Sequence, residues 1–589
     1  MTLRIANCSG FYGDRLTAMR EMIEAGQESA QVDVVTGDYL AELTMLILGK
    51  DQLKDPSLGY ARTFVKQVED CIELALEKGV KIVSNAGGLN PAGLAEKLQD
   101  LGAKVAYVDG DNLVARADEL GLGKPLTANA YLGAFGIASA LQHGADIVVT
   151  GRVTDASVVV GPAIAHYGWS RDDFDALAGA VVAGHVIECG TQATGGNFSG
   201  FRALWGKGLD LRPLGFPIAE VEADGSCVIT KHEGTGGAVT VDTVTAQLVY
   251  EVQSTRYFGP DVTTQLDTIS LDQVGPDRVR ISDVRGEAPP AETKVCVNVL
   301  GGFRNQAELV LTGLDIDAKA DWFRMQLEAA FEGNRPEFVD WALARTDHED
   351  ASTEEAASAR LRVVVRDPSP DRVGKGFTAP LVELALGSYP GFTMTTPPMP
   401  GTPYGVYQPY YVAQDTVPHV VHHHDGTVES VDPPPTTGGR AATGALAEAA
   451  SVETLEGDVT SLVSTDARQL AARPPGVTRR APLGTFVHAR SGDKGGDANI
   501  GLWVSEGRAD RAEWLLSTIT PDVVRALVPE AEDLEIEVFA LPNLRAVNVL
   551  IRGILGEGVA ASSRFDPQAK GLGEWVRSRY IEIPEELLS

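Results

Sequence analysis

Short apolar runs alternate with helical patterns over residues 3–150, and this alternation constrains the fold more than any other feature of the sequence. The apolar runs cover residues 3–6, 32–35, 80–84, 104–108 and 147–150. Helical patterns separate them at residues 15–25, 40–48, 60–77, 92–101 and 131–142. Strands that alternate with helices pair in parallel through right-handed crossovers. We therefore expect an α/β fold, with a parallel sheet in an N-terminal domain of residues 1–200.

Polar residues follow these apolar runs at the points where the strands should end. They are Asn7, Asp38, Asn85, Asn90, Asp109, Asp111, Arg152 and Asp155. The carboxyl ends of parallel strands meet at one edge of the sheet, where α/β proteins bind ligands. Gly87 and Gly88 would let backbone N–H groups approach an anionic ligand. Alternatively, these residues only form turns, which Gly, Asn and Asp all favour.

The segment 184–200, GHVIECGTQATGGNFSG, contains the candidate catalytic residues. His185 and Glu188 are three positions apart, so on a helix they face the same way. Such a pair can bind a metal, transfer protons with Asp155 as a further partner, or simply belong to an amphipathic helix. Cys189 would be a nucleophile only if a base lowered its pKa; an unpaired cysteine is more often a small buried apolar residue.

Glycine-rich stretches supply further candidates for binding an anion. Gly195 and Gly196 could form an oxyanion or phosphate cradle, or a plain helix-to-strand connection. Residues 488–499, HARSGDKGGDAN, place Arg490 and Lys494 among glycines. This stretch predicts either an anion-binding loop or an elaborate β-hairpin turn. The predicted substrate-binding residues are Asn7, Asn85, Gly87, Gly88, Asn90, Asp109, Arg152, Gly195, Gly196, Arg490 and Lys494.

Residues 201–432 follow a different pattern, which predicts an α+β elaboration of the N-terminal domain. Strand patterns occupy residues 227–231, 243–252, 279–284, 294–300, 307–311 and 360–365, and helical patterns occupy 319–332 and 337–343. Residues 397–412 are so rich in Pro and Tyr that we expect no regular element there. His419 and the run His422–His424 are expected at a solvated edge, because consecutive histidines on a strand point to alternate faces.

A linker and a small domain complete the predicted organisation. Residues 433–482 are rich in Pro, Ala, Thr and Gly, as interdomain linkers are. Residues 483–589 show the order β-β-α-β-β-α, with strands at 485–489, 500–504, 534–541 and 546–554 and helices at 512–527 and 572–579. This order predicts a small ferredoxin-like α+β domain.

Composition excludes several classes of function. The net charge of −31 argues against binding to nucleic acid or to an anionic membrane. The five cysteines include no CxxC pair, so neither a disulfide framework nor a structural zinc site is expected. Neither a GxGxxG nor a Walker A motif occurs, which argues against a nicotinamide or ATP enzyme. The absence of a signal-peptide pattern and of a long apolar run predicts a cytoplasmic protein.

Several motifs together resemble the acyclic terpene utilisation (AtuA) family. They are NCSGFYGDR near the start, SNAGGLNP at 84–91, ANAYLGAFGI and GADIVVTGRVTDAS within 128–157, and GHVIECGTQATGGNFSG at 184–200. ARSGDKGGDANIG resembles the small ferredoxin-fold domain that accompanies that family. The resemblance implies a role in the catabolism of branched or isoprenoid acids through coenzyme A thioesters, beside acyl-CoA carboxylases and enoyl-CoA hydratases.

These observations support three hypotheses. The first is an acyl-CoA hydratase or carbon–carbon lyase in which His185 transfers the proton and Glu188 and Asp155 orient it or hold a divalent metal. The second is a non-catalytic subunit or scaffold for an acyl-CoA carboxylase, and the third is a metal-dependent hydrolase. No required cofactor is evident, the expected substrate is a coenzyme A thioester, and a homo-oligomer is expected.

Overall fold

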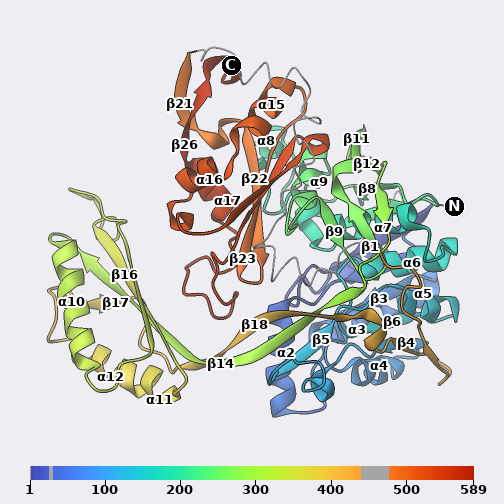
Figure 1. The fold of residues 1–589 in the computed structure, drawn as a ribbon, viewed down its shortest axis with the longest axis horizontal. Helices are drawn as coiled ribbons and strands as arrows, with labels where there is room; N and C mark the ends of the chain where they lie inside the picture. The colour runs from blue at the N-terminus through green and yellow to red at the C-terminus, as the bar shows by residue number, and fades with distance from the viewer. Residues whose placement is uncertain (1, 25–30, 439–476) are drawn as a thin grey trace. The chain divides into compact units, whose positions relative to one another are not determined.

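The computed structural model describes residues 2–24, 31–438 and 477–589, which form two compact units (Figure 1). Unit 1 comprises Met1–Asn298, Tyr407–Val559 and Asp566–Ser589, and unit 2 comprises Val299–Val406 and Ala560–Phe565. Most of the predicted linker, residues 439–476, lies outside the described residues. Among the described helices, none is both long enough and apolar enough to cross a membrane.

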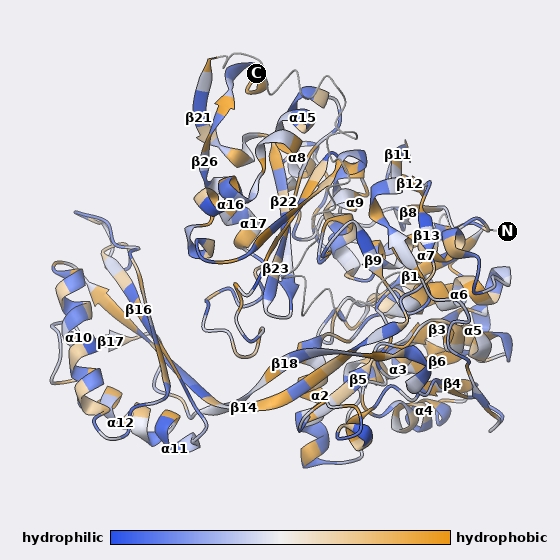
Figure 2. Ribbon diagram, in the orientation of Figure 1, coloured by the Kyte–Doolittle hydropathy of each residue, from blue (hydrophilic) through white to orange (hydrophobic). Residues whose placement is uncertain are grey.

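The predicted parallel sheet is confirmed and forms the centre of unit 1. Its strands, in spatial order, are β1 (Leu3–Asn7), β2 (Val34–Gly37), β3 (Lys81–Ser84), β6 (Ile147–Thr150) and β4 (Val105–Asp109). All four neighbouring pairs are parallel. Strand β6 is buried along its whole length and is apolar except for Thr150 at its end. Figure 2 shows hydrophobic residues in the strands of this sheet. Strands covered on both faces need such continuous apolar runs, which is why the sequence pattern identified them.

Two groups of helices cover the two faces of this sheet. The helices are α1 (Ala18–Glu24), α2 (Glu42–Lys54), α3 (Arg62–Lys78), α4 (Pro91–Gln99), α5 (Phe135–Gln142), α6 (Ser157–Tyr167) and α7 (Phe174–Ile187). Side chains of α1, α3 and α4 belong to one core cluster, and those of α5, α6 and α7 belong to another. Helix α3 ends at Gly79, whose φ of +69° is the left-handed conformation of a helix C-cap.

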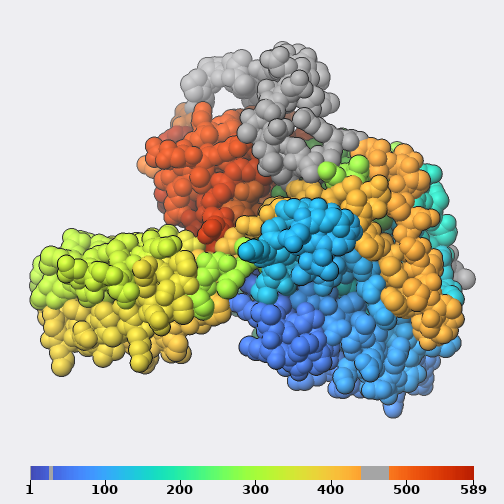
Figure 3. All heavy atoms as spheres, turned by 60° about the horizontal axis from the view of Figure 1, so that its bottom comes forward, coloured from blue at the N-terminus to red at the C-terminus, as the bar shows by residue number. Residues whose placement is uncertain are grey.

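Antiparallel strands extend the sheet at both ends to eleven strands. Four follow β1, namely β7 (Pro217–Val221), β8 (Cys227–Lys231), β12 (Arg278–Ser282) and β11 (Ser270–Gly275), and two follow β4, namely β19 (Val420–His422) and β20 (Val428–Ser430). A separate three-stranded sheet contains β9 (Arg256–Phe258), β10 (Thr263–Gln265) and β13 (Arg285–Glu287). Figure 3 shows the orange segment that includes β19 and β20 on the surface beside the blue part of the chain.

One predicted strand of this region is wrong. Residues 243–252 were expected to be extended, but α9 (Val241–Leu248) is a helix. The Thr240 side chain accepts a hydrogen bond from the Thr243 backbone N–H, and the Thr243 hydroxyl bonds the Thr240 backbone in return. This reciprocal cap stabilises the first turn despite the β-branched composition of the segment. Strand β5 (Thr127–Ala130), which pairs with β14, was not predicted.

Unit 2 contains a sheet covered by helices on one face. Its elements are β14 (Glu292–Thr312), which begins in unit 1, α10 (Ile316–Ala330), β15 (Phe338–Ala344), β16 (Ser358–Asp367), α11 (Pro370–Val373), α12 (Lys375–Glu383), β17 (Thr393–Met394) and β18 (Thr402–Ala413). The helix predicted at 337–343 is strand β15, which pairs with β16 over seven residues. The segment 397–412 was expected to be irregular but contains most of β18, which pairs with β14. Cross-strand pairing therefore overrides local propensity in both segments.

The C-terminal domain contains the predicted β-β-α-β-β-α order, flanked by two strands that were not predicted, β21 and β26, of which β21 lies within the predicted linker 433–482. Its elements are β21 (Thr478–Pro482), β22 (Val487–Lys494), β23 (Asp497–Val504), α15 (Ala509–Thr518), α16 (Pro521–Leu527), β24 (Ile536–Leu541), β25 (Ala546–Ile551), α17 (Leu572–Ser578) and β26 (Tyr580–Pro584). Strands β22, β23, β25 and β24 form an antiparallel sheet, and β21 pairs with β26. The single helix predicted at 512–527 is two helices, because Pro521 starts α16 with Thr520 as its N-cap.

The C-terminal domain packs against the core of unit 1 through amide side chains. The Asn499 amide donates to the Val249 carbonyl over 3.1 Å, and its oxygen accepts from the Glu251 backbone N–H over 2.7 Å. Asn548 donates to the Val252 carbonyl over 3.1 Å. Trp503, only 1% exposed, donates its indole N–H to Asp242 over 3.2 Å. These bonds fix residues 249–252 against the C-terminal sheet.

Candidate active site

The predicted strand tips come together at one edge of the parallel sheet. Asn7, at the end of β1, donates its side-chain amide to the carbonyls of Ile187 (2.5 Å) and Glu188 (2.9 Å). These carbonyls lie at the end of α7, where the helix leaves them without an intrahelical partner. Asn7 is 1% exposed, so it fixes the end of α7, and with it His185 and Glu188, against the sheet.

Asp38 and Asn85 form a second buried pair at the tips of β2 and β3. The Asn85 amide donates to Asp38 Oδ1 over 2.6 Å, and its oxygen accepts the Tyr39 backbone N–H over 2.8 Å. Burial and the charges of Asp155 and Glu188 raise the pKa of Asp38 well above its usual value, while Arg152 and the Asn85 hydrogen bond oppose this. The protonated form of Asp38 is therefore favoured more than that of an ordinary aspartic acid.

Arg152, after β6, is the buried cation of this edge. Its guanidinium is 2.5 Å from Asp155 Oδ1 and lies 4.1 Å above the centre of the Tyr131 ring. Its backbone N–H donates to Asp111, whose pKa burial raises to about 6. The Arg152 side chain is 2% exposed, whereas that of Asp155 is 29% exposed. Asp155 therefore stands between the buried arginine and the solvent.

His185 and Glu188 form a buried dyad at the end of α7. His185 Nδ1 is 3.1 Å from Glu188 Oε1, and the two residues are 4% and 8% exposed. His185 Nε2 and Glu188 Oε2 have no hydrogen-bond partner within the described chain. Burial raises the pKa of Glu188, as do the charges of Asp155 and Glu251, while His185 opposes the shift. The ring of Tyr257 lies 5.1 Å from the His185 ring.

A second charged group contains Glu42, Tyr131 and Lys294, of which none was predicted from the sequence. Glu42 Oε1 accepts the Tyr131 hydroxyl over 3.0 Å and lies 3.2 Å from Lys294 Nζ. Burial would raise the pKa of Glu42, but the charges of Lys294, Arg152 and Lys494 hold it well below its usual value. Glu42 is therefore ionised, and Arg152 links this group to the strand tips.

The C-terminal domain adds cations to the same cluster. Lys570 Nζ lies 3.0 Å from Glu251 Oε1 and 3.4 Å from Asp493 Oδ1, and it bonds the Tyr250 hydroxyl. Arg490 bonds Gln192 and the Asn197 carbonyl, and lies 4.2 Å from the Tyr250 ring centre. The Lys494 ammonium has no hydrogen-bond or ion-pair partner in the part of the chain that the structure describes.

Glu251 connects the two halves of the cluster. Its φ of +55° lies in the left-handed region, which is uncommon for a residue other than glycine. Burial opposes ionisation, but Lys570 and Lys494 lower the pKa of Glu251, and its charge in turn raises the pKa of Glu188. The hydrogen bond from its backbone N–H to Asn499 holds this strained conformation.

The remaining predicted residues do not join this cluster. Asn90 caps α4 by accepting the Gly93 backbone N–H, and Asp109 lies 3.3 Å from His422 on the neighbouring strand β19. Gly87 and Gly88 are packed tightly, since a Cβ would lie 2.5 Å from the Thr150 carbonyl oxygen and 2.4 Å from Leu48 Cδ1, respectively. Gly195 and Gly196 form the turn after the short helix Gly190–Thr194 that carries Gln192, the partner of Arg490.

Cys189 is not an activated thiol in this arrangement. Burial raises its pKa well above the usual value, as do the charges of Glu188 and Glu251. A nucleophilic cysteine needs the opposite environment, with cations or a helix N-terminus that stabilise the thiolate. Cys189 therefore packs beside the dyad as a protonated side chain.

The histidine run makes separate contacts, and only His422 lies in strand β19. The expected solvated edge is wrong for His423, which is 6% exposed. His422 stacks on Tyr107 with ring centres 4.2 Å apart, while His423 stacks on His143 and bonds Glu429 over 3.0 Å. Within residues 2–24, 31–438 and 477–589, no group of three or more His, Cys, Asp and Glu side chains is arranged to hold a metal ion. His185, Glu188 and Asp155 therefore do not form a ligand set here.

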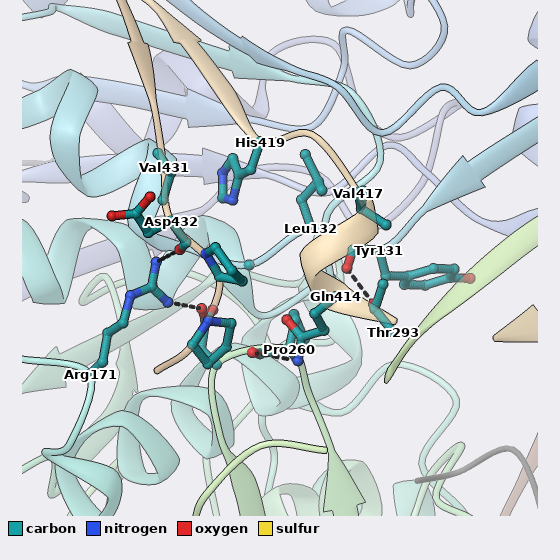
Figure 4. A pocket seen from close by; sticks show the side chains of 14 residues that line it. Tyr131, Leu132, Arg171, Pro260, Thr293, Gln414, Val417, His419, Val431 and Asp432 are labelled. Atoms are coloured by element: carbon teal, nitrogen blue, oxygen red, sulfur yellow. Dashed lines mark hydrogen bonds and ion pairs between the residues drawn. The ribbon is translucent and has the colours of Figure 1, made fainter. Parts of the chain in front are cut away.

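A cavity of about 30 Å³ lies between Tyr131 and the segment before β19 (Figure 4). Arg171 crosses it, donating to the Asp432 carbonyl over 2.6 Å and lying 3.9 Å from Asp261. Burial and the charge of Arg171 lower the pKa of His419 to about 4, so its imidazole is neutral. Because the cavity holds little more than one water molecule, it is too small for an acyl substrate.

Comparison with known protein families agrees with the motifs. The model of the acyclic terpene utilisation family protein AtuA matches residues 3–423, and that of the AtuA ferredoxin-like domain matches residues 481–582. The chain belongs to the AtuA family. No curated protein matches the chain. AtuA membership implies a role in acyclic terpene utilisation.

The charged cluster of this AtuA protein uses residues from both matched regions. Asn7, Asp38, Asn85, Arg152, Asp155, His185, Glu188, Arg490 and Lys494 were recognised in the sequence. Glu42, Tyr131, Tyr250, Glu251, Lys294 and Lys570 were not. The sequence pointed to the contribution of the C-terminal domain through the glycine-rich hairpin of residues 488–499, which contains Asp493 and Lys494.

Proposed function

We propose that this protein is an acyl-CoA-processing enzyme of the hydratase or carbon–carbon lyase type, acting in the catabolism of branched or isoprenoid acids. The observation that carries the proposal is the His185–Glu188 dyad, whose imidazole has Nε2 buried and without a hydrogen-bond partner among the described residues. An imidazole that donates from Nδ1 to a carboxylate keeps the lone pair on Nε2 free to accept a proton.

The second requirement of such a reaction is a proton donor. Asp38 suits this role, because burial and the neighbouring carboxylates raise its pKa well above the usual value. A base and an acid whose environments separate their pKa values are the usual arrangement for elimination at neutral pH. In a dehydration, His185 would take the proton from the carbon next to the thioester carbonyl, and Asp38 would protonate the departing hydroxyl group.

Cations around the cluster suit the negative charge that develops on the thioester oxygen. Arg152 is fixed by Asp155 and Tyr131, and Lys494 has an ammonium group that no described side chain neutralises directly. Fixed cations in a water-poor site stabilise an oxyanion more than mobile ones do. A divalent metal is not part of this proposal.

The test is mass spectrometry of the full chain incubated with a panel of branched 3-hydroxyacyl-CoA and enoyl-CoA thioesters. We expect a mass change of one water, or cleavage, for at least one thioester, and a loss of at least a hundredfold in rate for His185→Ala. His348→Ala is the matched control, because His348 is exposed and lies in unit 2.

Binding of a thioester without turnover, together with co-purification of an acyl-CoA carboxylase, would contradict the catalytic proposal and favour the scaffold role. Full activity of His185→Ala would contradict the assignment of the base. The homo-oligomeric state and the cytoplasmic location stay predictions, and gel filtration of the purified chain tests the first of them.

A further inference from the structure

A series of hydrogen bonds links Ser199 to the carboxylate of Asp242 through the first histidine of the glycine-rich hairpin. His488 Nδ1 is 3.2 Å from Ser199 Oγ, and His488 Nε2 is 3.1 Å from Ser505 Oγ. The Ser505 hydroxyl in turn donates to Asp242 Oδ2 over 2.8 Å. All four residues belong to unit 1. An imidazole between a serine hydroxyl and a fixed acceptor is the arrangement that acyl-transfer enzymes use to activate serine.

The partners of these groups determine where the protons lie. A hydroxyl has one proton, and Ser505 donates it to Asp242, so Ser505 Oγ accepts from His488 Nε2–H. The lone pair of the neutral imidazole is then on Nδ1, the atom next to Ser199 Oγ. The Ala489 backbone N–H donates to Ser199 Oγ over 3.3 Å, which leaves the Ser199 proton for His488 Nδ1. His488 is thus held in the tautomer that can take a proton from Ser199.

The imidazole of His488 is fixed in position and favoured in its neutral form. It stacks on the rings of Phe198 and Trp503, whose centres are 5.7 Å and 5.3 Å away. Trp503 donates its indole N–H to Asp242 over 3.2 Å, so the carboxylate that accepts from Ser505 is fixed as well. Burial lowers the pKa of His488, although the charge of Asp242 opposes this shift. A neutral, oriented imidazole can act as a general base at neutral pH.

The backbone at Ser199 supplies donors for the oxygen of an acyl group. In the described ranges of the chain, neither the Ser199 nor the Gly200 backbone N–H donates a hydrogen bond. The N–H groups of a nucleophilic serine and of the residue that follows it commonly bind the oxyanion of the tetrahedral intermediate. Ser199 and His488 are each only partly buried, so both keep some surface exposed to solvent.

We propose that Ser199 is the nucleophile, and His488 the base, of a second catalytic site that hydrolyses activated acyl compounds, namely esters or thioesters. A bond forms from Ser199 Oγ to the carbonyl carbon, the bond from that carbon to the leaving oxygen or sulfur breaks, and the serine proton passes through His488 to the leaving group. Water then hydrolyses the acyl-serine, which releases the acid and restores the hydroxyl. Ser505 and Asp242 are positioning residues, because they act through His488. This reaction is independent of the one proposed above, because the two share no side chain.

Covalent labelling of the full chain with a fluorophosphonate tests the proposal. The reagent phosphonylates an activated serine with loss of fluoride, and peptide mapping by mass spectrometry identifies the modified residue. We expect the label at Ser199, no label in that peptide of Ser199→Ala, and a labelling rate lower by roughly a hundredfold in His488→Gln. Ser57→Ala is the matched control and should label normally, because the exposed Ser57 bonds the carboxylate of Asp55 rather than a histidine.

Two substitutions of Ser505 test its positioning role. Ser505→Ala should slow the labelling of Ser199 by roughly tenfold, the usual effect of losing a neutral hydrogen bond. Ser505→Thr keeps the hydroxyl and should restore the rate, and release of p-nitrophenolate from p-nitrophenyl acetate should follow the same order. Absence of label at Ser199 in the unsubstituted chain would overturn the proposal without reliance on any variant, and so would equal labelling rates in the unsubstituted chain and folded His488→Gln.

Discussion

Replacement of Lys570 by methionine should weaken the packing of the C-terminal domain on the core, and the structure sets the size of the effect. Lys570 Nζ lies 3.0 Å from Glu251 Oε1 and 3.4 Å from Asp493 Oδ1. Removing one partner of a fully buried ion pair costs about 3–5 kcal/mol, whereas an exposed pair contributes about 0–1 kcal/mol. The Lys570 side chain is 36% exposed and that of Glu251 is 28% exposed. An intermediate loss of about 1–3 kcal/mol follows from these limits.

A double-mutant cycle with Glu251→Gln separates the ion pair from other effects of the substitution. Glu251 carries the nearer of the two charges that Lys570 compensates, so Lys570→Met should cost less when Glu251 is already glutamine. We expect a coupling of about 1 kcal/mol or more between the two positions. Asp493, the second partner of Lys570, is present in both backgrounds and sets the residual cost.

Tryptophan fluorescence during urea denaturation measures how stably the C-terminal domain packs on the core. Trp503, one of the seven tryptophans of the chain, belongs to the C-terminal domain, is 1% exposed and bonds Asp242 of the core. The part of the emission that is lost in Trp503→Phe therefore reports the separation of the two parts. Midpoints are the quantity to compare, because a chain of this size need not unfold in two states. Additive shifts for Lys570→Met and Glu251→Gln would show that the pair contributes nothing and would refute the reasoning.

Two further predictions concern backbone conformation and pH. Gly88→Ala should destabilise the protein by roughly 1–3 kcal/mol, because the φ is +54° and the new Cβ would lie 2.4 Å from Leu48 Cδ1. Gly79→Ala, with φ +69° but no atom within 4 Å, should cost only about 1 kcal/mol in the same thermal melts; equal losses would contradict the packing argument. Burial and the charge of Glu251 raise the pKa of Asp493 to about 6. A carboxyl whose pKa is higher in the folded state favours folding below its unfolded pKa of about 4, and this contribution is lost as the pH rises through 6. Asp493→Asn should therefore flatten the decline in melting temperature between pH 4 and 7; an unchanged decline would exclude Asp493 as its source.

The parallel sheet could be predicted because its signals are local. Each of its strands is an apolar run followed within a few residues by a polar turn, and Asn7, Asp38 and Asn85 lie at those turns. The same local reasoning failed for α9, where reciprocal bonds between Thr240 and Thr243 outweigh the β-branched composition. It also failed for β15 and β18, whose extended conformation depends on pairing with strands distant in sequence.

The same limit explains which site residues could be recognised. His185, Glu188 and Asp155 lie within glycine-bounded motifs, and their spacing carries a signal. Glu251 and Lys570 are more than three hundred positions apart, and only the packing of the C-terminal domain brings them to 3.0 Å. The left-handed backbone conformation of Glu251 could not be predicted either, because glutamate does not favour that conformation. Site residues that are brought together only by long-range contacts therefore cannot be recognised from a single sequence.

The charges of the cluster favour the attachment of the C-terminal domain to the core, because the two parts carry opposite charges there. Among the described residues, the core part of the cluster contains the carboxyl groups of Asp38, Glu42, Asp111, Asp155, Glu188 and Glu251 and the cations Arg152 and Lys294. The C-terminal domain contributes three cations, Arg490, Lys494 and Lys570, against the single carboxyl group of Asp493. Without these cations, the thioester oxygen of the proposed reaction would face a surplus of negative charge. With them, and with Asp38 held toward its protonated form, the cluster would balance the negative charge that develops in the proposed reaction. On this reasoning the ferredoxin-like domain supplies part of the positive charge of the candidate active site.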